Sequence, residues 1–159
     1  KLENLQDTGS FKLRGATNRL LALPEAERLR GCITASSGNH GAGVALASKR
    51  LRIHGVVFVP EHTSKTKLAS IQGYGGEVRM FGTDGLDTEE YARSFALENE
   101  QDFISPYNEP VIIEGQGSCA VEIVEELPEV DVAFVAIGGG GLISGVAAVL
   151  KQHNPAVRI

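Results

Sequence analysis

Short apolar runs alternate along the chain with longer stretches that have helical periodicity. Residues 53–59 are almost all apolar, which is typical of a parallel strand covered on both faces, and Pro60 follows them. Strands are predicted at residues 31–35, 53–59, 77–81, 102–105 and 130–137. Helices are predicted at residues 11–23, 39–50, 64–73, 84–100, 117–127 and 142–152. This alternation predicts an α/β fold in which crossover helices connect the strands of a parallel sheet.

Proline and glycine mark the boundaries of these elements. Pro24 ends the first predicted helix, and Leu2 is placed on a short extended segment before it. Pro106 and Pro110 bracket an irregular connection, which is the best candidate for a crossing between domains. No internal repeat and no low-complexity segment is present.

Composition narrows the class of protein. The 159 residues are 42% hydrophobic and 22% charged, with a net charge of −5 and no basic tract, so nucleic-acid binding is not expected. No apolar run approaches the roughly 20 residues that span a bilayer, so no membrane partner is expected. Cys32 and Cys119 fit no metal-binding spacing; we expect no metal site, two buried thiols and a reducing, cytoplasmic location. Lys1 and Ile159 both read as interior positions, so a fragment of a longer chain is expected.

Lys12 is the first residue with candidate chemistry. It follows Phe11 at the start of a predicted helix, where the positive end of the helix dipole disfavours a cation. Such a place, with apolar neighbours, lowers the pKa of a lysine and favours a nucleophilic amine. A solvated surface lysine is the competing interpretation, and the spacing alone does not separate the two.

Two further sites lie where a predicted strand passes into a helix. The Ser36-Ser37-Gly38-Asn39-His40-Gly41 segment suits a carboxylate or phosphate, but it is equally a plausible helix cap. Gly138-Gly139-Gly140-Gly141-Leu142 presents successive backbone N–H groups to an anion. The spacing matches neither GxGxxG nor a P-loop. A phosphate-bearing cofactor that needs an amine is the economical way to combine the three sites.

Several motifs in this order resemble the serine/threonine dehydratase and serine racemase family of fold-type II pyridoxal-phosphate enzymes, which is tryptophan synthase β-like. The resemblance covers essentially the whole chain. It rests on residues 1–6 (KLENLQ), 9–16 (GSFKLRGA), 36–41 (SSGNHG), 115–117 (GQG) and 138–145.

The resemblance implies a set of residue roles. Lys12 would form the Schiff base with pyridoxal 5′-phosphate, and Phe11 would lie against the pyridine ring. Asn39 would bind the phenolic oxygen of the ring, while Gly138, Gly139, Gly140, Gly141 and Leu142 would hold the 5′-phosphate. Ser36, Ser37, Gly38, Asn39 and His40 would receive the substrate carboxylate.

The same resemblance implies the architecture and the reaction. The expected fold is a three-layer sandwich around a parallel sheet. Residues 31–108 would form a small α/β domain with a four-stranded sheet, and residues 1–30 and 109–159 would belong to a large domain. The expected activity is β-elimination: L-serine, L-threonine or a related hydroxy amino acid gives a 2-oxo acid and ammonia, with the Lys12 amine removing the α-proton. A homo-oligomer is also expected.

Two departures from the dehydratase pattern affect this prediction. Many L-specific dehydratases carry alanine at the position of Ser37, whereas racemase-like members carry serine, so amino-acid racemisation is an alternative activity with Ser37 as a second catalytic residue. Ser105-Pro106-Tyr107-Asn108 replaces a more usual His-Pro-Phe/Tyr pattern. A paralogue that binds the cofactor without turnover is a further alternative. His40 and the all-glycine turn argue against a cysteine-synthase-like enzyme, and a nicotinamide domain is more distant still.

Overall fold

The structure is a computed structural model that describes all of residues 1–159. Its centre is a four-stranded sheet in the order β3-β2-β1-β4, in which every pair of neighbouring strands is parallel. The strands are β1 (Cys32–Ala35), β2 (Gly55–Val59), β3 (Glu77–Met80) and β4 (Asp102–Phe103). The predicted α/β class with a parallel sheet is therefore confirmed.

Helices cover both faces of the sheet. Alternate residues of the central strands point to opposite faces, and the apolar side chains on each face pack against helices. Val57 and Val59 pack with Ala45 of α3 (Asn39–Leu51) and Ile71 of α4 (Lys65–Gly73). The neighbouring residues of β2 face the other way, toward α5 (Gly85–Glu98). Asp84 caps α5, since its side chain accepts hydrogen bonds from two backbone N–H groups of the first turn. The result is the expected three-layer sandwich.

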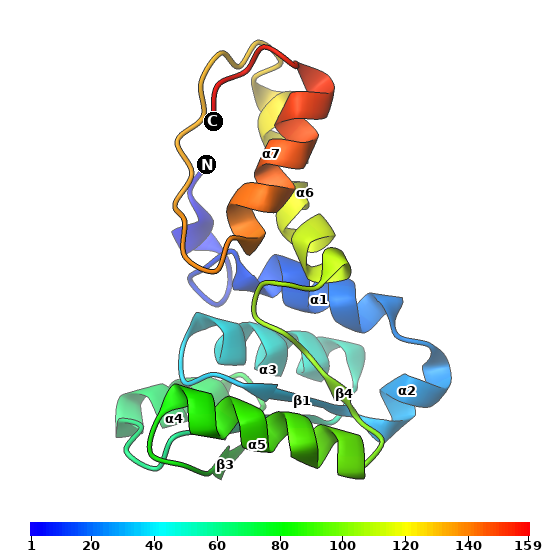
Figure 1. Cartoon of the computed structure of the whole chain (residues 1–159), viewed down its shortest axis with the longest axis vertical. Helices are drawn as coiled ribbons and strands as arrows, with labels where there is room; N and C mark the ends of the chain where they lie inside the picture. Colours follow the sequence, from blue (N-terminus) through cyan, green and yellow to red (C-terminus); the bar gives the residue numbers. More distant parts are fainter.

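A stack of helices continues outward from α3. In Figure 1, α1 (Lys12–Ala22) lies over α3, and α6 (Pro110–Glu126) and α7 (Gly141–His153) lie beyond α1. The largest cluster of buried apolar residues fills the space between α1, α3 and β1 and includes Leu13, Leu20 and Val44. All four strands lie within the predicted small domain at residues 31–108, although the division into domains stays a prediction.

Two short helices were not predicted. α2 (Glu25–Arg30) follows Pro24, and the 3-10 helix η1 (Glu3–Leu5) begins directly after Leu2. Pro24 was interpreted only as a helix end, but it also serves as the N-cap of α2, whose acidic first turn and basic last turn complement the helix dipole.

The start of α6 was predicted seven residues too late, at Gly117. Pro110 occupies the first turn of this helix, where a missing N–H costs nothing. Gly115 and Gly117 do not break α6. They lie inside it, where the helix passes very close to α1 and α7: a Cβ added at Gly115 would lie 2.7 Å from the Cα of Gly15. The glycines reflect close helix packing rather than a turn.

The prediction of a buried strand at residues 130–137 was wrong. This segment makes only an isolated parallel bridge, between Val132 and Arg158, and Phe134 is 97% exposed. An apolar run forms a buried strand only where other strands pair with it and both of its faces are covered. Here Val130 packs against α6 and α7, but only the backbone near Arg158 pairs with the segment.

Both cysteine thiols are free and buried, as expected. Burial raises the pKa of the Cys32 thiol to about 11, and Cys32 lies 3.3 Å from the hydroxyl of Ser48. None of the helices is long and apolar enough to cross a membrane.

Candidate active site

The candidate site lies at the carboxyl edge of the sheet, where the strand order reverses. β1 is followed in sequence by β2 and β3 on one side, and the chain then returns to place β4 on the other side of β1. Open α/β sheets bind ligands outside the carboxyl ends of strands at such a switch point. The segment Ser36–Asn39 follows β1 there, and Ile104 follows β4.

The backbone carbonyl of Ile104 joins the ends of these two strands. It accepts hydrogen bonds from Thr34 Oγ1 at 2.9 Å and from His40 Nε2 at 3.0 Å. Because the acceptor is a carbonyl, the His40 ring carries its proton on Nε2. Burial lowers the pKa of His40 to about 4, with a smaller contribution from the positive charge of Lys12. His40 is therefore neutral at physiological pH, and its side chain fixes the start of α3 instead of facing solvent.

Lys12 lies at the beginning of α1, close to the same segment. Its ammonium donates a hydrogen bond to the carbonyl of Pro106 and stands 5.3 Å from the centre of the Phe11 ring. α3 passes directly beside it, since a Cβ added at Gly43 would lie 3.1 Å from the Lys12 carbonyl carbon. Burial lowers the pKa of the Lys12 amine, which is the direction expected of a nucleophilic lysine.

The glycine turn meets the residue that follows Pro106. An added Cβ at Gly139 would lie 2.5 Å from Cγ of Tyr107, and one at Gly141 would lie 2.8 Å from the Tyr107 carbonyl oxygen. Gly138 and Gly140 face open space instead, and Gly140 has a φ of 86°, a conformation that favours glycine. The turn leads into the 13-residue helix α7, whose first N–H groups point out of the helix end. Leu142 is in the first turn of α7.

The Ser36–Asn39 loop borders a cavity at the same edge of the sheet. This cavity of about 310 Å³ is lined by Ala35, Ser36, Ser37, Gly38, Pro60, Gly85 and Thr88. Ser36 Oγ accepts a hydrogen bond from Gly38 N at 3.2 Å, and Ser37 is half-buried. Asn39 is exposed at the first position of α3. None of these side chains forms a hydrogen bond with Lys12, whose amine donates to Pro106.

One short segment, residues 104–107, thus touches all the sites that the sequence singled out. Ile104 holds the start of α3, Pro106 accepts from Lys12, and Tyr107 lies in the glycine turn. The sequence marked Ser105-Pro106-Tyr107-Asn108 only as a departure from a family pattern. Its position directly after a predicted strand was the signal that it borders the site.

The residues present fit a phosphorylated aldehyde cofactor. The glycine turn offers backbone N–H groups at a helix N-terminus, the arrangement that binds phosphate. Lys12 offers a partly desolvated amine. Two hydroxyl oxygens just before it, Thr8 Oγ1 and Ser10 Oγ, are buried and have no hydrogen-bond partner within the protein.

Comparison with protein families decides which cofactor this is. The family model of the pyridoxal-phosphate dependent enzymes matches residues 1–159. The chain belongs to this family. The predicted family and the predicted cofactor, pyridoxal 5′-phosphate, are thereby confirmed.

Curated relatives narrow the family further. The chain is 42% identical over 159 residues to the L-threonine ammonia-lyase of Thermotoga maritima, covering all of this chain and 40% of that protein. It is 43% identical over 159 residues to the catabolic L-threonine dehydratase TdcB of Escherichia coli K12, covering 100% of this chain and 48% of that protein. The chain therefore spans less than half the length of these relatives.

Solved structures agree with the fold. The processed form of threonine deaminase isoform 2 from Solanum lycopersicum superposes with a TM-score of 0.97 at 38% identity, over 99% of this chain and 46% of that one. Maize serine racemase superposes with a TM-score of 0.96 at 38% identity, over 100% of this chain and 48% of that one.

Proposed function

We propose that the complete protein is a pyridoxal-phosphate-dependent ammonia-lyase that converts L-threonine, L-serine or a related hydroxy amino acid into a 2-oxo acid and ammonia. The observation that carries this proposal is the meeting of Lys12 and the glycine turn at Pro106 and Tyr107. The names of two curated relatives, a threonine ammonia-lyase and a threonine dehydratase, support the reaction class.

Lys12 would carry the cofactor and move the proton. When bound, pyridoxal phosphate supplies an electron sink for the α-carbon of an amino acid. The lowered pKa of Lys12 favours the neutral amine, which both attaches to an aldehyde and removes a proton from the α-carbon. Phe11 would lie beside the ring, and its contact with Lys12 supports that role.

The remaining residues would hold the phosphate of the cofactor and the carboxylate of the substrate. The N–H groups of residues 138–142 would bind the 5′-phosphate. Asn39 would bind the ring oxygen, and the Ser36–Gly38 loop would receive the substrate carboxylate. Because the His40 ring is turned inward to Ile104, its backbone N–H, rather than its side chain, is the group that would contact a carboxylate.

Ammonia release by the full-length protein tests the proposal. We expect the wild type to release ammonia and a 2-oxo acid from L-threonine or L-serine, and Lys12→Ala to reduce this by about three orders of magnitude or more. Lys67→Ala changes an exposed lysine of α4 and should leave the rate unchanged. Turnover that survives in Lys12→Ala would refute the role of Lys12. Cofactor attachment without turnover would instead identify the paralogue that only binds the cofactor.

Racemisation is a second candidate, favoured by the position of Ser37. Its half-buried side chain lines the cavity beside the carboxylate loop and forms no hydrogen bond with the protein. A hydroxyl there would exchange a proton with the substrate α-carbon from the face opposite Lys12. D-serine should then form from L-serine in the wild type and not in Ser37→Ala, with ammonia release retained; absence of D-serine in the wild type would exclude this activity.

A homo-oligomeric state and a cytoplasmic location complete the proposal. The free, buried thiols Cys32 and Cys119 are compatible with a reducing compartment. The mass of the full-length protein in solution, measured by light scattering after size exclusion, checks the oligomeric state.

A further inference from the structure

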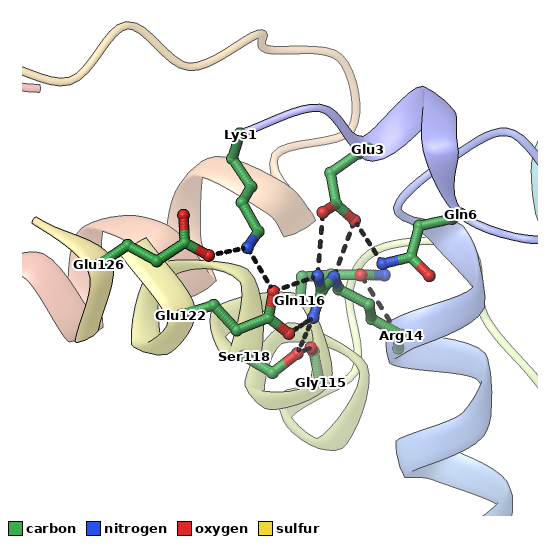
Figure 2. Close-up of polar contacts among 10 residues, drawn as sticks. Lys1, Glu3, Gln6, Arg14, Gly115, Gln116, Ser118, Glu122 and Glu126 are labelled. Carbon is green, nitrogen blue, oxygen red and sulfur yellow. Dashed lines mark hydrogen bonds and ion pairs between the residues drawn. The ribbon is translucent and has the colours of Figure 1, made fainter. Parts of the chain in front are cut away.

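Arg14 is clamped between two carboxylates from different parts of the chain (Figure 2). Its Nε and Nη2 atoms donate to the two oxygens of Glu3, at 2.7 and 2.9 Å. Its Nη1 and Nη2 atoms donate to the two oxygens of Glu122, at 2.7 and 2.9 Å. Nη1 also reaches Ser118 Oγ at 3.1 Å. One guanidinium therefore ties η1 and α6 to the first turn of α1.

The clamp is an extended chain of alternating charges. Lys1 donates to Glu122 and to Glu126, each at 2.8 Å, and Gln6 donates to Glu3 at 3.3 Å. Hydrogen bonds from Arg14, and then from Lys1, lower the pKa of Glu122 to about 2, so this carboxylate stays ionised at physiological pH. The Arg14 side chain is only 10% exposed, so water screens its ion pairs less than it screens those at the open surface.

Arg14 and Lys12 occupy opposite sides of the same helical turn. Two residues correspond to roughly 200° of rotation about an α-helix. Lys12 points to Pro106 on one side of α1, while Arg14 points to Glu3 and Glu122 on the other. Any rotation or shift of this turn that loosens the clamp therefore moves the Lys12 amine.

The next residue of α1 has little freedom to compensate. The N–H of Gly15 donates to Oε1 of the buried Gln116 side chain at 3.2 Å, and Gly115 lies against Gly15 without room for a Cβ. The helices are thus in contact at backbone level immediately after Arg14. The contact at Gly15 fixes the distance between α1 and α6, and the Arg14 side chain holds the turn directly before that contact.

We propose that Arg14 is a positioning residue for Lys12: the double carboxylate clamp by Glu3 and Glu122 sets the rotation of the first turn of α1 and so holds the Lys12 amine toward Pro106 and the glycine turn. The proposal rests on the role of Lys12 in the proposed function. The decisive feature is the pair of two-pronged contacts, which a planar guanidinium makes and an ammonium does not.

Two measurements on the cofactor-free, full-length protein test the clamp. The first is the rate of covalent attachment of pyridoxal 5′-phosphate to Lys12, trapped with borohydride and located by mass spectrometry. The second is the acetylation of Lys12 by trace acetic anhydride, relative to the exposed Lys67 in the same sample, which requires no cofactor.

Arg14→Lys is the principal variant because it keeps the charge and loses the two-pronged geometry. We expect attachment to Lys12 to slow by roughly tenfold or more, since a displacement of about 1 Å can cost up to a hundredfold. Acetylation of Lys12 relative to Lys67 should rise at least severalfold as the amine leaves Pro106. Glu122→Gln, which weakens one side of the clamp, should shift both measurements in the same directions by a smaller factor.

Two controls separate positioning from stability. Arg93→Met removes an exposed ion pair within α5, between Arg93 and Glu89, and should change neither measurement. Ile71→Ala removes a buried side chain of α4 and should lower the melting temperature without altering the Lys12 ratio. If Arg14→Lys keeps the wild-type attachment rate and acetylation ratio, or if Ile71→Ala changes them equally, the clamp is only structural and the proposal is wrong.

Failure of the proposed function gives a different result. A wild type that does not attach the cofactor at Lys12 would overturn the proposed function. The acetylation ratio of Arg14→Lys would still decide whether Arg14 orients the Lys12 amine.

Discussion

The ring of Tyr107 lies in the space that a side chain at Gly139 would need, with only 2.5 Å between Tyr107 Cγ and an added Cβ. At Gly138, one residue earlier, an added Cβ would have no heavy atom within 4 Å. The two glycines therefore serve different purposes: Gly138 leaves space open, whereas Gly139 makes room for an aromatic ring from the segment that also binds Lys12.

Gly139→Ala should destabilise the protein by about 1–3 kcal/mol, because an added methyl group must displace a packed ring. Gly138→Ala is the matched control and should leave the free energy of unfolding nearly unchanged. Because Tyr107→Ala removes the ring that an alanine at residue 139 would meet, the effects of Tyr107→Ala and Gly139→Ala should be non-additive in the double variant. Urea unfolding of the cofactor-free, full-length protein is measured for the wild type, the single variants Gly139→Ala, Gly138→Ala and Tyr107→Ala, and the double variant. Equal losses for the two alanine variants of the turn would contradict the steric explanation.

Lys12 should react with amine reagents at lower pH than an exposed lysine. Burial lowers its pKa, so the neutral amine is present over a pH range in which an ordinary lysine is still charged. The pH dependence of trace acetylation, followed for Lys12 and for Lys67 in one digest, checks this. A Lys12 profile that titrates together with, or above, that of Lys67 would show that the amine is not desolvated.

His40 should make the protein more sensitive to acid. Its pKa is about 4 when folded and ordinarily 6.5, so the unfolded chain binds more protons between these values. The corresponding stability is fully present above pH 6.5 and is lost as the pH falls to about 4. The difference of pKa corresponds to about 3 kcal/mol.

His40→Gln is the variant that isolates this effect, because its amide can donate to the Ile104 carbonyl without titrating. The free energy of unfolding of the wild type should fall between pH 7.5 and pH 4.5 by more than that of His40→Gln, with a difference of about 2–3 kcal/mol. Parallel pH curves for the two proteins would mean that folding does not lower the pKa of His40.

Local pattern was enough to predict the sheet and the helices that cover it. β2 was identified from a continuous apolar run and α5 from an acidic start, and both depend on residues next to one another in sequence. The strand at residues 130–137 was predicted on the same grounds and was wrong, because pairing depends on other strands. An apolar run indicates that a segment favours burial, but it does not indicate whether a neighbouring strand is present to pair with it.

The candidate site was predicted in its parts but not in its assembly. Lys12 and the glycine turn were each recognisable from local chemistry and from the family resemblance. Pro106 and Tyr107 join these two sites. Pro106 binds Lys12 through its backbone carbonyl, and Tyr107 packs its ring against Gly139, which lies more than 30 residues further along the chain. A backbone carbonyl or a packed aromatic ring at these positions cannot be assigned a partner from the residue type, so these contacts are identified only in the folded structure.

The crossing of α1 and α6 gives the last prediction. An added Cβ at Gly115 would lie 2.7 Å from the Cα of Gly15 and 2.9 Å from the carbonyl oxygen of Arg14, both of them backbone atoms that cannot rotate away. Gly115→Ala should therefore push the helices apart, cost about 1–3 kcal/mol in stability and disturb the clamp on Arg14.

Gly73→Ala is the matched control, because Gly73 lies in the last turn of α4 and an added Cβ would have no heavy atom within 4 Å. It should be neutral or slightly stabilising, since alanine favours a helix by up to about 1 kcal/mol over glycine. Thermal unfolding of the full-length protein gives the stability difference, and acetylation of Lys12 relative to Lys67 reports whether the turn has moved. A Gly115→Ala protein as stable as Gly73→Ala would show that α1 and α6 do not meet at backbone distance.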